Sequence, residues 1–469
     1  MARKRTENGD DDLYRVKAGA TKELFIYMLV RDLVLRDAIG DLVDNSVDAV
    51  RRVVNTSAEE PSEFALTSDK YKGYYLTLTF DGSQFVIEDN CGGMEAETAR
   101  EYAFRFGRDP SAPPTPGSIG QFGIGMKRAL FKLGRHFHIT SKAANSSFEL
   151  TIDVDKWLES PDWDFRFDDY SERPTLQAEA RGMRIVVTRL NPDVSDILGS
   201  GASNLFESRL NKEIGNENLF NINNGFIIKI NNNRLRPRQL EILTAPEFKA
   251  GSFTQTYYEY DERGQRAAVE VRIITGIGES KLSDGGWYIF CNERLIVGPN
   301  QDSISGWIGQ GSGTPKYHGQ YERFRGYVFL SSDNAAVLPW NTTKTSMDMD
   351  SKLYISVRQE MIRMMGPVIT FLNDMKKERE KDNPIENRPL EAAVARARLA
   401  PILTVATEQQ APQFVAPRPS PVTPLVAKQL IRYYTDMERF ELVKKSLRAS
   451  RKDDVGPMVF DYYYRNEVE

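Results

Sequence analysis

The stretch Asp41-Leu42-Val43-Asp44-Asn45-Ser46-Val47-Asp48-Ala49 decides the fold of this chain, because three acids and an amide recur in it at helical spacing. At about 100° per residue, one narrow stripe of the helix holds Asp41, Asp44, Asn45 and Asp48. The opposite arc, which we expect to face the core, holds Leu35, Ala38, Ile39, Leu42, Ser46 and Ala49. A polar stripe is often only a solvated face, but such faces normally mix Lys, Arg and Glu. Oxygen ligands packed in this way suit a hard cation such as Mg²⁺, so the helix is predicted to carry a site.

Two glycine-containing loops follow in the sequence. Residues 85–88, FVIE, are predicted to form a short strand that enters the loop DNCGGM at residues 89–94, where paired glycines permit backbone angles closed to other residues. The second loop, GSIGQFGIG at residues 117–125, leads into a predicted helix over residues 126–133 that Gly134 ends. A glycine-rich loop before a helix N-terminus presents free backbone N–H groups to an anion, and Lys127 would add charge there.

Each glycine loop alone is weak evidence, because such turns are common. The sequence contains no G-x-x-x-x-G-K-[ST] motif, and residues 117–125 are not the first turn of an N-terminal βαβ unit. P-loop and dinucleotide-binding folds are therefore poor fits. The order of the acidic helix and the two loops must carry the argument.

In order and spacing, the three segments resemble the motifs of the GHKL ATPase superfamily. This superfamily includes gyrase B subunits, the ninety-kilodalton heat-shock chaperones, MutL-type mismatch-repair ATPases, histidine kinases and Microrchidia (MORC) proteins. Its helix motif E-x-x-x-N-x-x-D-A is met by Asp41, Asn45, Asp48 and Ala49. Its D-x-G-x-G motif is met by Asp89 and Gly93, with Cys91 at the first glycine, and its G-x-x-G-x-G motif by Gly120, Gly123 and Gly125.

The resemblance implies an α+β protein with a Bergerat-type α/β sandwich that binds Mg-ATP. Asn45 would ligate the Mg²⁺, Asp89 would hold the adenine amino group, and residues 105–119 would form a mobile lid. A Gly-Thr pair of the family is half present as Gly182-Met183. The nucleotide-binding residues implied are Asn45, Asp48, Ala49, Asp89, Gly93, Met94, Gly120, Gln121, Phe122, Gly123, Ile124, Gly125 and Lys127.

Asp41 is the main departure from the family pattern, which normally has a water-activating Glu there. Aspartate is one methylene shorter, so its carboxylate lies about 1.5 Å further from a water placed for Glu. Misplacement on the order of 1 Å can lower a rate roughly 10²-fold. We therefore expect slow hydrolysis with Asp41 as the base and Asp44 as a less well placed substitute.

A strand-rich region begins near Gly225, and within it residues 287–296, WYIFCNERLI, resemble the strand-turn-strand of a transducer domain of α/β character. Residues 338–345, LPWNTTKT, resemble the transducer loop that carries a cation to the γ-phosphate, which makes Lys344 the predicted sensor. Most loop lysines are simply solvated; the position of Lys344 between the last predicted strand and a helix favours the functional interpretation. Among relatives, GQFGIGMK looks closest to MORC and chaperone versions, and Lys127 to MORC.

Length and composition agree with a multi-domain protein. The chain has 469 residues, 40% hydrophobic content and a net charge of −4, which gives no global attraction to nucleic acid. We predict an ATP-binding domain at 15–210, a transducer at 211–370, a helix end and Pro-rich linker at 371–424, and a C-terminal helical segment at 425–469. In the last segment, the tyrosines at 462–464 are expected to pack in a core.

Two cysteines and three histidines give neither a disulfide framework nor a common structural zinc site. No apolar run is long enough for a membrane helix and the first residues lack a signal core, so a cytoplasmic protein without membrane insertion is predicted. A histidine kinase would need a phosphoacceptor histidine before the Asn45 helix, yet His136, His138 and His318 all follow it. His136 and His138 alternate along a predicted strand as structural or surface residues.

Two functional hypotheses remain from the sequence. By resemblance, the leading one is a slow Mg-dependent ATPase that forms a homodimer through its N-terminal domains when ATP binds, and closes as a conformational clamp on a DNA or protein client. The other is an ATP-sensing scaffold or chaperone-like adaptor with little hydrolysis, which Asp41 and Cys91 keep open. Measured turnover distinguishes the two.

Overall fold

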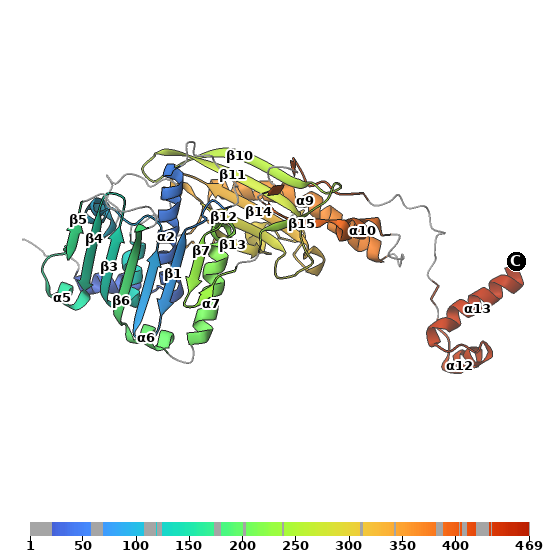
Figure 1. Cartoon of the computed structure of the whole chain (residues 1–469). Coiled ribbons are helices and arrows are strands. Elements are labelled where there is room, and N and C mark those ends of the chain that lie inside the picture. The colour runs from blue at the N-terminus through green and yellow to red at the C-terminus, as the bar shows by residue number, and fades with distance from the viewer. Residues whose placement is uncertain are drawn as a thin grey trace, which may run out of the picture. The chain divides into compact units, whose positions relative to one another are not determined.

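The computed structural model divides into two compact units, Met1–Pro419 and Ser420–Glu469. It describes residues 21–57, 69–106, 119, 124–172, 180–199, 203–236, 239–309, 313–341, 344–380, 388–402, 404–405, 410–418, 431–432 and 434–468. The first unit contains two large sheets with helices packed on them (Figure 1). The mixed α+β class predicted from the sequence is confirmed.

Among the described residues, the first sheet has eight strands in the order β5-β4-β3-β6-β2-β1-β7-β8. They are β1 (Tyr75–Phe80), β2 (Gln84–Asp89), β3 (Gly134–Lys142), β4 (Ser147–Asp153), β5 (Asp169–Ser171), β6 (Gly182–Leu190), β7 (Ile227–Ile230) and β8 (Asn233–Arg234). All neighbours are antiparallel except β1 and β7. Side chains alternate between the two faces of the sheet: in β1, Leu76 and Leu78 are buried, whereas Thr77 and Thr79 lie on the other face.

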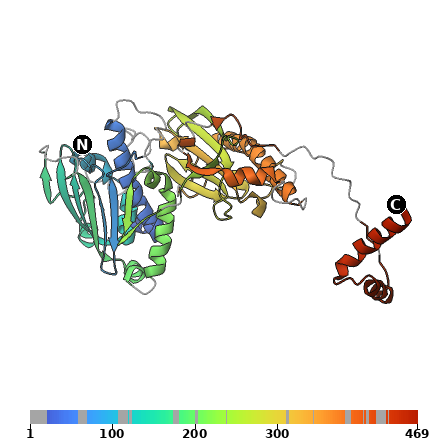
Figure 2. The ribbon, with the colours of Figure 1, turned by 45° about the vertical axis from the view of Figure 1, so that its right-hand side comes forward.

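Helices cover the apolar face of this sheet, and Figure 2 shows them on one side of it. The opposite face is polar: His136 Nδ1 lies 3.0 Å from Thr188 Oγ1, and His138 Nδ1 lies 3.0 Å from Thr151 Oγ1. The helices of this half are α1 (Lys22–Val30), α2 (Leu35–Ser57), α3 (Ala96–Thr98), η1 (Ala99–Ala103), α4 (Gly125–Leu133), α5 (Val154–Glu159), α6 (Pro192–Gly199), α7 (Ser203–Glu217) and α8 (Leu219–Asn223).

The second sheet, in the described residues, has six strands in the order β13-β12-β14-β11-β10-β16. They are β10 (Ala250–Tyr260), β11 (Arg266–Ile277), β12 (Gly286–Cys291), β13 (Arg294–Asn300), β14 (Phe324–Ser331) and β16 (Gln410–Ala411). Helix α9 (Lys352–Glu380) packs with one face of the sheet, and α10 (Pro389–Arg396) lies beside α9 (Figure 2). The other face contacts α8 and a two-stranded sheet of β9 (Glu241–Thr244) and β15 (Arg398–Pro401). Because both faces are covered, β12 and β14 read as nearly unbroken apolar runs. The described residues of this half also form the short 3₁₀ helices η3 (Ser303–Ser305), η4 (Gly319–Tyr321) and η5 (Ala335–Val337).

The sheet order bears on the predicted division near residue 210. Strands β7 and β8 follow that point in the chain, yet β7 pairs with β1 and completes the first sheet. Helix α8 comes before them and buries Leu219 and Phe220 against the second sheet. The domain limits stay predictions, and the strand pairing favours a later boundary, after Arg234.

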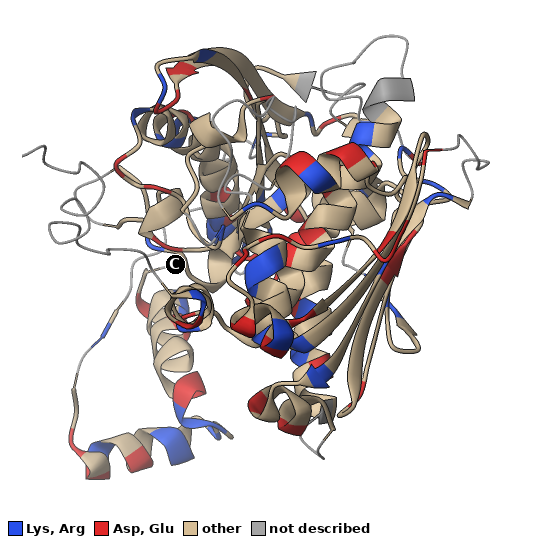
Figure 3. Ribbon diagram, turned by 90° about the vertical axis from the view of Figure 1, so that its left-hand side faces the viewer, with Lys and Arg blue, Asp and Glu red and all other residues tan. Residues whose placement is uncertain are grey.

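The C-terminal unit consists of short helices with little buried surface. They are α12 (Met437–Ser446), η7 (Lys452–Asp454), α13 (Val455–Tyr463) and η8 (Tyr464–Val468). The expected core packing of the tyrosine cluster is wrong for this unit, because Tyr462 and Tyr463 are 66% and 61% exposed. Figure 3 shows both basic and acidic residues in this unit. In the part of the chain that the structure describes, no helix is long and apolar enough to cross a bilayer.

Candidate functional site

Helix α2 presents its polar stripe to protein rather than to water. Asp44 is only 2% exposed and Asp48 only 6%, whereas Asn45 between them is exposed and Asp41 and Ala49 are partly buried. The expected core residues Leu35, Ala38, Ile39 and Leu42 are all buried. The simple solvated face is therefore excluded, because buried carboxylates need partners that offset the loss of hydration.

Asp41 lies against the start of α4, where the second glycine loop ends. A Cβ placed on Gly125 would lie 3.5 Å from the Asp41 carboxyl carbon. The same carboxylate accepts Arg128 Nε at 2.7 Å and lies 2.6 Å from Arg128 Nη2, both at Oδ2. Its second oxygen, Oδ1, is 3.7 Å from Lys344 Nζ. The predicted base is thus ion-paired to two cations, one from each half of the first unit.

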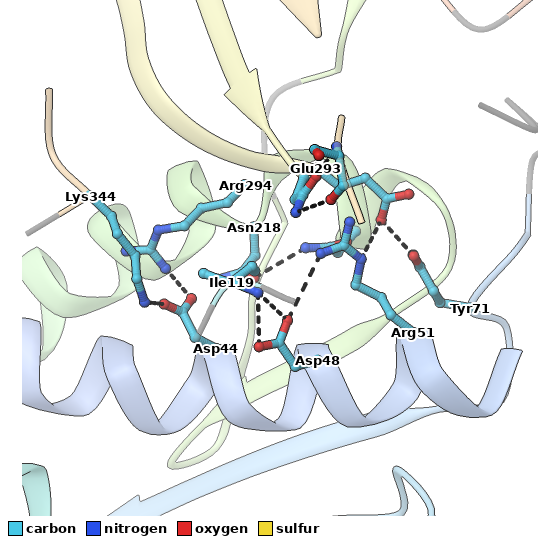
Figure 4. A network of polar contacts seen from close by, with 12 residues as sticks. Asp44, Asp48, Arg51, Tyr71, Ile119, Asn218, Glu293, Arg294 and Lys344 are labelled. Atoms are coloured by element: carbon cyan, nitrogen blue, oxygen red, sulfur yellow. Dashed lines mark hydrogen bonds and ion pairs between the residues drawn. The ribbon is translucent and has the colours of Figure 1, made fainter. Parts of the chain in front are cut away.

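Asp44 is the anchor of a buried ion cluster that joins α2 to the second half (Figure 4). Its Oδ1 accepts a hydrogen bond from Arg294 Nη1, and its Oδ2 accepts one from Lys344 Nζ at 2.9 Å. Burial alone would raise the pKa of Asp44, but the charges of Arg294 and Lys344 hold it below the usual value. Arg294 Nη2 also lies 3.2 Å from Glu217 at the end of α7, and burial raises the pKa of Glu217 to about 7.

A second cluster lies further along α2 and uses the neighbouring residue of the β12–β13 turn. Glu293, at φ 67°, accepts from Tyr71 OH at 2.5 Å and Lys70 Nζ at 3.0 Å, and lies 3.3 Å from Arg51 Nε. The charges of Arg51 and Lys70 hold the pKa of Glu293 low against the effect of burial. Glu293 of the turn and Arg294, the first residue of β13, therefore contact α2 at two places about two helical turns apart (Figure 4).

Asp48 contacts the segment that enters the second glycine loop. Both of its oxygens accept the backbone N–H of Ile119, at 2.8 and 2.9 Å. Four of the predicted nucleotide-binding residues, Gly120, Gln121, Phe122 and Gly123, lie outside the described residues. The loop resumes at Ile124, the N-cap of α4, and Gly134 ends this helix as predicted.

The first glycine loop holds Asp89 at the end of β2. Asp89 Oδ2 accepts from Ser46 Oγ at 2.6 Å and Oδ1 accepts from Cys91 N at 2.9 Å, while burial raises the Asp89 pKa. Gly93 has φ 68°, and a Cβ there would lie 2.2 Å from Lys142 O, so this position requires glycine. Met94 donates its backbone N–H to Ser141 Oγ at 2.7 Å. Sequence reasoning missed Ser46 because it lies on the helix arc expected to face the core.

Lys127 is held by two backbone carbonyls from the segment before the second glycine loop. Its Nζ donates to Ala103 O at 2.8 Å and to Arg105 O, the side chain is 4% exposed, and burial lowers its pKa to about 8. The residue of α4 that contacts the α2 stripe is Arg128, which the sequence analysis did not single out. Lys127 and Arg128 therefore contact different groups, and the phosphate contact of Lys127 stays a prediction.

The side chains of α2 can be compared with the oxygen ligands that Mg²⁺ prefers. Asn45 is the exposed residue of the stripe, one turn after Asp41, and its amide oxygen is a ligand of the type that Mg²⁺ takes. No group of three or more His, Cys, Asp or Glu side chains in the described ranges could hold a metal by itself. The exposed Asn45 amide oxygen itself fits a Mg²⁺ that takes its other ligands from water and substrate phosphates.

Residues 33–179 match the family described as histidine kinase-, DNA gyrase B- and HSP90-like ATPases. This is a GHKL-type ATPase domain. The match begins just before α2 and covers both glycine loops, so it contains Asp41, Asn45 and Asp89. A comparison of the chain with curated proteins gives no match.

A GHKL-type ATPase domain over residues 33–179 implies ATP binding and hydrolysis by that domain. Three of the residues that surround the α2 stripe, Glu217, Arg294 and Lys344, lie beyond the matched range. The sequence identified Lys344 through its loop, but Arg294 had no signal beyond its place in the strand-turn-strand. Ion pairs of Asp44 thus connect the ATPase domain to the second sheet and to the loop that carries Lys344.

Proposed function

We propose that this protein is a Mg-dependent ATPase of slow turnover, which couples the nucleotide at α2 to movement of the second sheet. The observation that carries the proposal is the meeting of Asp41, on the ATPase domain, with Lys344, on a loop beyond the second sheet, at 3.7 Å. A cation from another part of the chain at the predicted base can respond to the γ-phosphate. The match of residues 33–179 to GHKL-type ATPases supports ATP as the bound nucleotide.

In this proposal each polar group has a separate task. Asp89, held by Ser46 and the Cys91 N–H, accepts from the adenine amino group. Asn45 holds Mg²⁺ together with the phosphates, and the ion supplies neutralisation of phosphate charge when bound. The helix α4 N-terminus, from Ile124 and Gly125, faces the phosphates with its positive dipole end.

Hydrolysis needs one water and one base. The water oxygen attacks the γ-phosphorus, the bond from that phosphorus to the β–γ bridging oxygen breaks, and ADP leaves with that oxygen. Asp41 takes the proton of the attacking water, and Lys344 stabilises the charge on the γ-phosphoryl oxygens. Because Asp41 is shorter than Glu, its carboxylate lies further from the attacking water, and turnover is slow.

The Asp44 cluster supports a conformational role for this turnover. Lys344 shares Asp44 with Arg294, so a shift of Lys344 toward phosphate alters the contact between α2 and the β12–β13 turn. By analogy with GHKL relatives, we propose that the second sheet is a transducer, that ATP closes a homodimer through the N-terminal domains, and that the clamp holds DNA or a protein client. The likeness of GQFGIGMK to MORC proteins supports this finer assignment.

The test measures Mg²⁺-dependent ATP binding, steady-state hydrolysis and oligomeric state for wild type, Asp41→Asn and Asn45→Ala, with Arg184→Gln as a surface control. We expect slow wild-type turnover, loss of binding in Asn45→Ala, and an ATP-bound dimer without turnover in Asp41→Asn. Equal background hydrolysis in all four proteins would overturn the catalytic assignment.

A second candidate function is an ATP-sensing scaffold with little hydrolysis. The observation that favours it is the ion pairing of both Asp41 oxygens, which occupies the atoms that would have to accept the proton of the attacking water. It predicts tight ATP binding and an ATP-dependent change of oligomeric state with no turnover above background. The same assay distinguishes it from the clamp ATPase.

A further inference from the structure

Arg128 makes the closest ion pair of the predicted base. Its Nε and Nη2 lie 2.7 and 2.6 Å from Asp41 Oδ2, while the other cation near Asp41, Lys344, is 3.7 Å from Oδ1 and has Asp44 at 2.9 Å. The Arg128 side chain is 25% exposed and that of Asp41 is 10% exposed. Lys344 is therefore mainly a partner of Asp44, and Arg128 is the cation that occupies Asp41.

The position of Arg128 also makes it a neighbour of any anion at the α4 N-terminus. It lies in the first turn of α4, its backbone N–H bonds to Ile124 O at 2.9 Å, and its guanidinium lies on the carboxylate that packs against Gly125. A triphosphate carries more charge than one carboxylate and offers several oxygens in the geometry that guanidinium binds best. Lys127 cannot take this place while its ammonium is held by the Ala103 and Arg105 carbonyls.

We propose that Arg128 exchanges partners: it binds the Asp41 carboxylate in the nucleotide-free protein and a phosphate oxygen when ATP is bound. The inference rests on the proposed nucleotide site and adds a residue to it. Arg128 is then a phosphate contact and a positioning residue for Asp41, because the exchange releases the carboxylate only when substrate is present. The base is thereby occupied in the empty site and free in the filled one.

The exchange has a thermodynamic signature that a fixed ion pair lacks. If ATP breaks the Arg128–Asp41 pair, the effects of Arg128→Gln and Asp41→Asn on ATP affinity cannot add, since either change alone already removes the pair that must be broken. If the pair persists in the complex, the two effects add within about twofold. Adenosine lacks phosphates, so it leaves the pair intact in either case.

The experiment is calorimetric titration of the full-length wild type, Arg128→Gln, Asp41→Asn, the double variant and Arg128→Lys with Mg-ATP and with adenosine. Arg135→Gln is the matched control, because Arg135 forms an ion pair with Asp155 just beyond the C-terminus of α4. Circular dichroism and thermal melting of each protein verify the fold. Turnover is measured on Arg128→Gln and Arg128→Lys in parallel.

We expect Arg128→Gln to weaken ATP binding about tenfold and Asp41→Asn to tighten it about threefold or more. The double variant should deviate from the sum of the two effects by about three- to tenfold. Adenosine affinity should stay within about twofold in all of them. Arg128→Gln should raise KM with kcat little changed, and Arg128→Lys should restore part of the ATP affinity. Loss of a purely structural residue would not raise KM while leaving kcat little changed.

Two results overturn the inference in distinguishable ways. An additive cycle, or an ATP affinity of Arg128→Gln equal to that of Arg135→Gln, refutes the exchange while the nucleotide site stands. Failure of folded wild type to bind either ATP or adenosine refutes the nucleotide site itself, and the inference with it.

Discussion

Replacing Arg294 by Met removes the guanidinium that forms ion pairs with both α2 and α7. The Arg294 side chain is 6% exposed, and it joins Asp44, whose side chain is 3% exposed, to Glu217. Removing one partner of a buried pair costs about 3–5 kcal/mol, because the other charge stays buried without compensation. Asp44 keeps Lys344 at 2.9 Å, and Glu217 can take up a proton near neutral pH, so we expect the lower end, about 3 kcal/mol.

The assay is urea unfolding of Arg294→Met, Asp44→Asn and the double variant, followed by far-UV circular dichroism and tryptophan fluorescence. The double variant should cost much less than the sum of the single changes, with a coupling of about 2 kcal/mol. Arg184→Met is the matched control, because its ion pair with Glu88 is about half exposed and should contribute less than about 1 kcal/mol. An unfolding midpoint of Arg294→Met equal to that of Arg184→Met would refute a buried link between α2 and the β12–β13 turn.

Three further predictions concern other parts of the first unit. Lys22→Met should lower the free energy of unfolding by about 2 kcal/mol in urea, with exposed Glu23→Ala unchanged, because the Lys22 ammonium donates to three backbone carbonyls at 2.6–2.7 Å. The stability of Glu217→Gln relative to wild type should rise by about 2 kcal/mol between pH 5 and pH 8. In wild type, the Glu217 pKa raised to about 7 contributes stability that is fully present below pH 4.5 and is lost as the pH rises through 7. A difference in urea midpoints that does not change with pH would contradict this. Phe414→Ala should cost about 3 kcal/mol, because its buried ring packs near Phe371 at 5.8 Å, and limited proteolysis should then cleave at residues 410–418 first; unchanged cleavage would oppose it.

Local pattern was sufficient for the elements that carry the site. The helix spacing of the acidic stripe, the strand before the first glycine loop and the strand-turn-strand at residues 287–296 all appear as α2, β2 and the β12–β13 pair. Their periodicity and turn residues are properties of neighbouring positions, which sequence displays directly. The roles assigned to Asp41, Asn45 and Lys344 stay predictions.

What the sequence could not predict depends on partners far along the chain. Asp44 is buried with Arg294 and Lys344 as its partners. These lie 250 and 300 residues later in the chain, and no local pattern indicates that pairing. The sheet that β7 joins is likewise set by its pairing with β1. On α4, a difference of one residue turns a side chain by about 100°, which separates the carbonyl-bound Lys127 from Arg128 beside the base.

The central strand of the first sheet has a consequence for how the protein is made. Strand β6 lies between β3 and β2 and begins at Gly182, after the matched ATPase range has ended at residue 179. A nascent chain that stops earlier holds two sheet fragments, each with an open edge ready to pair wrongly. Synthesis of β6 joins the fragments, and β7 extends the far edge only after α7 and α8 have emerged. A genetic fusion or truncation placed at the end of the family match would therefore yield an aggregation-prone half-sheet, and expression should begin to succeed only beyond Arg234.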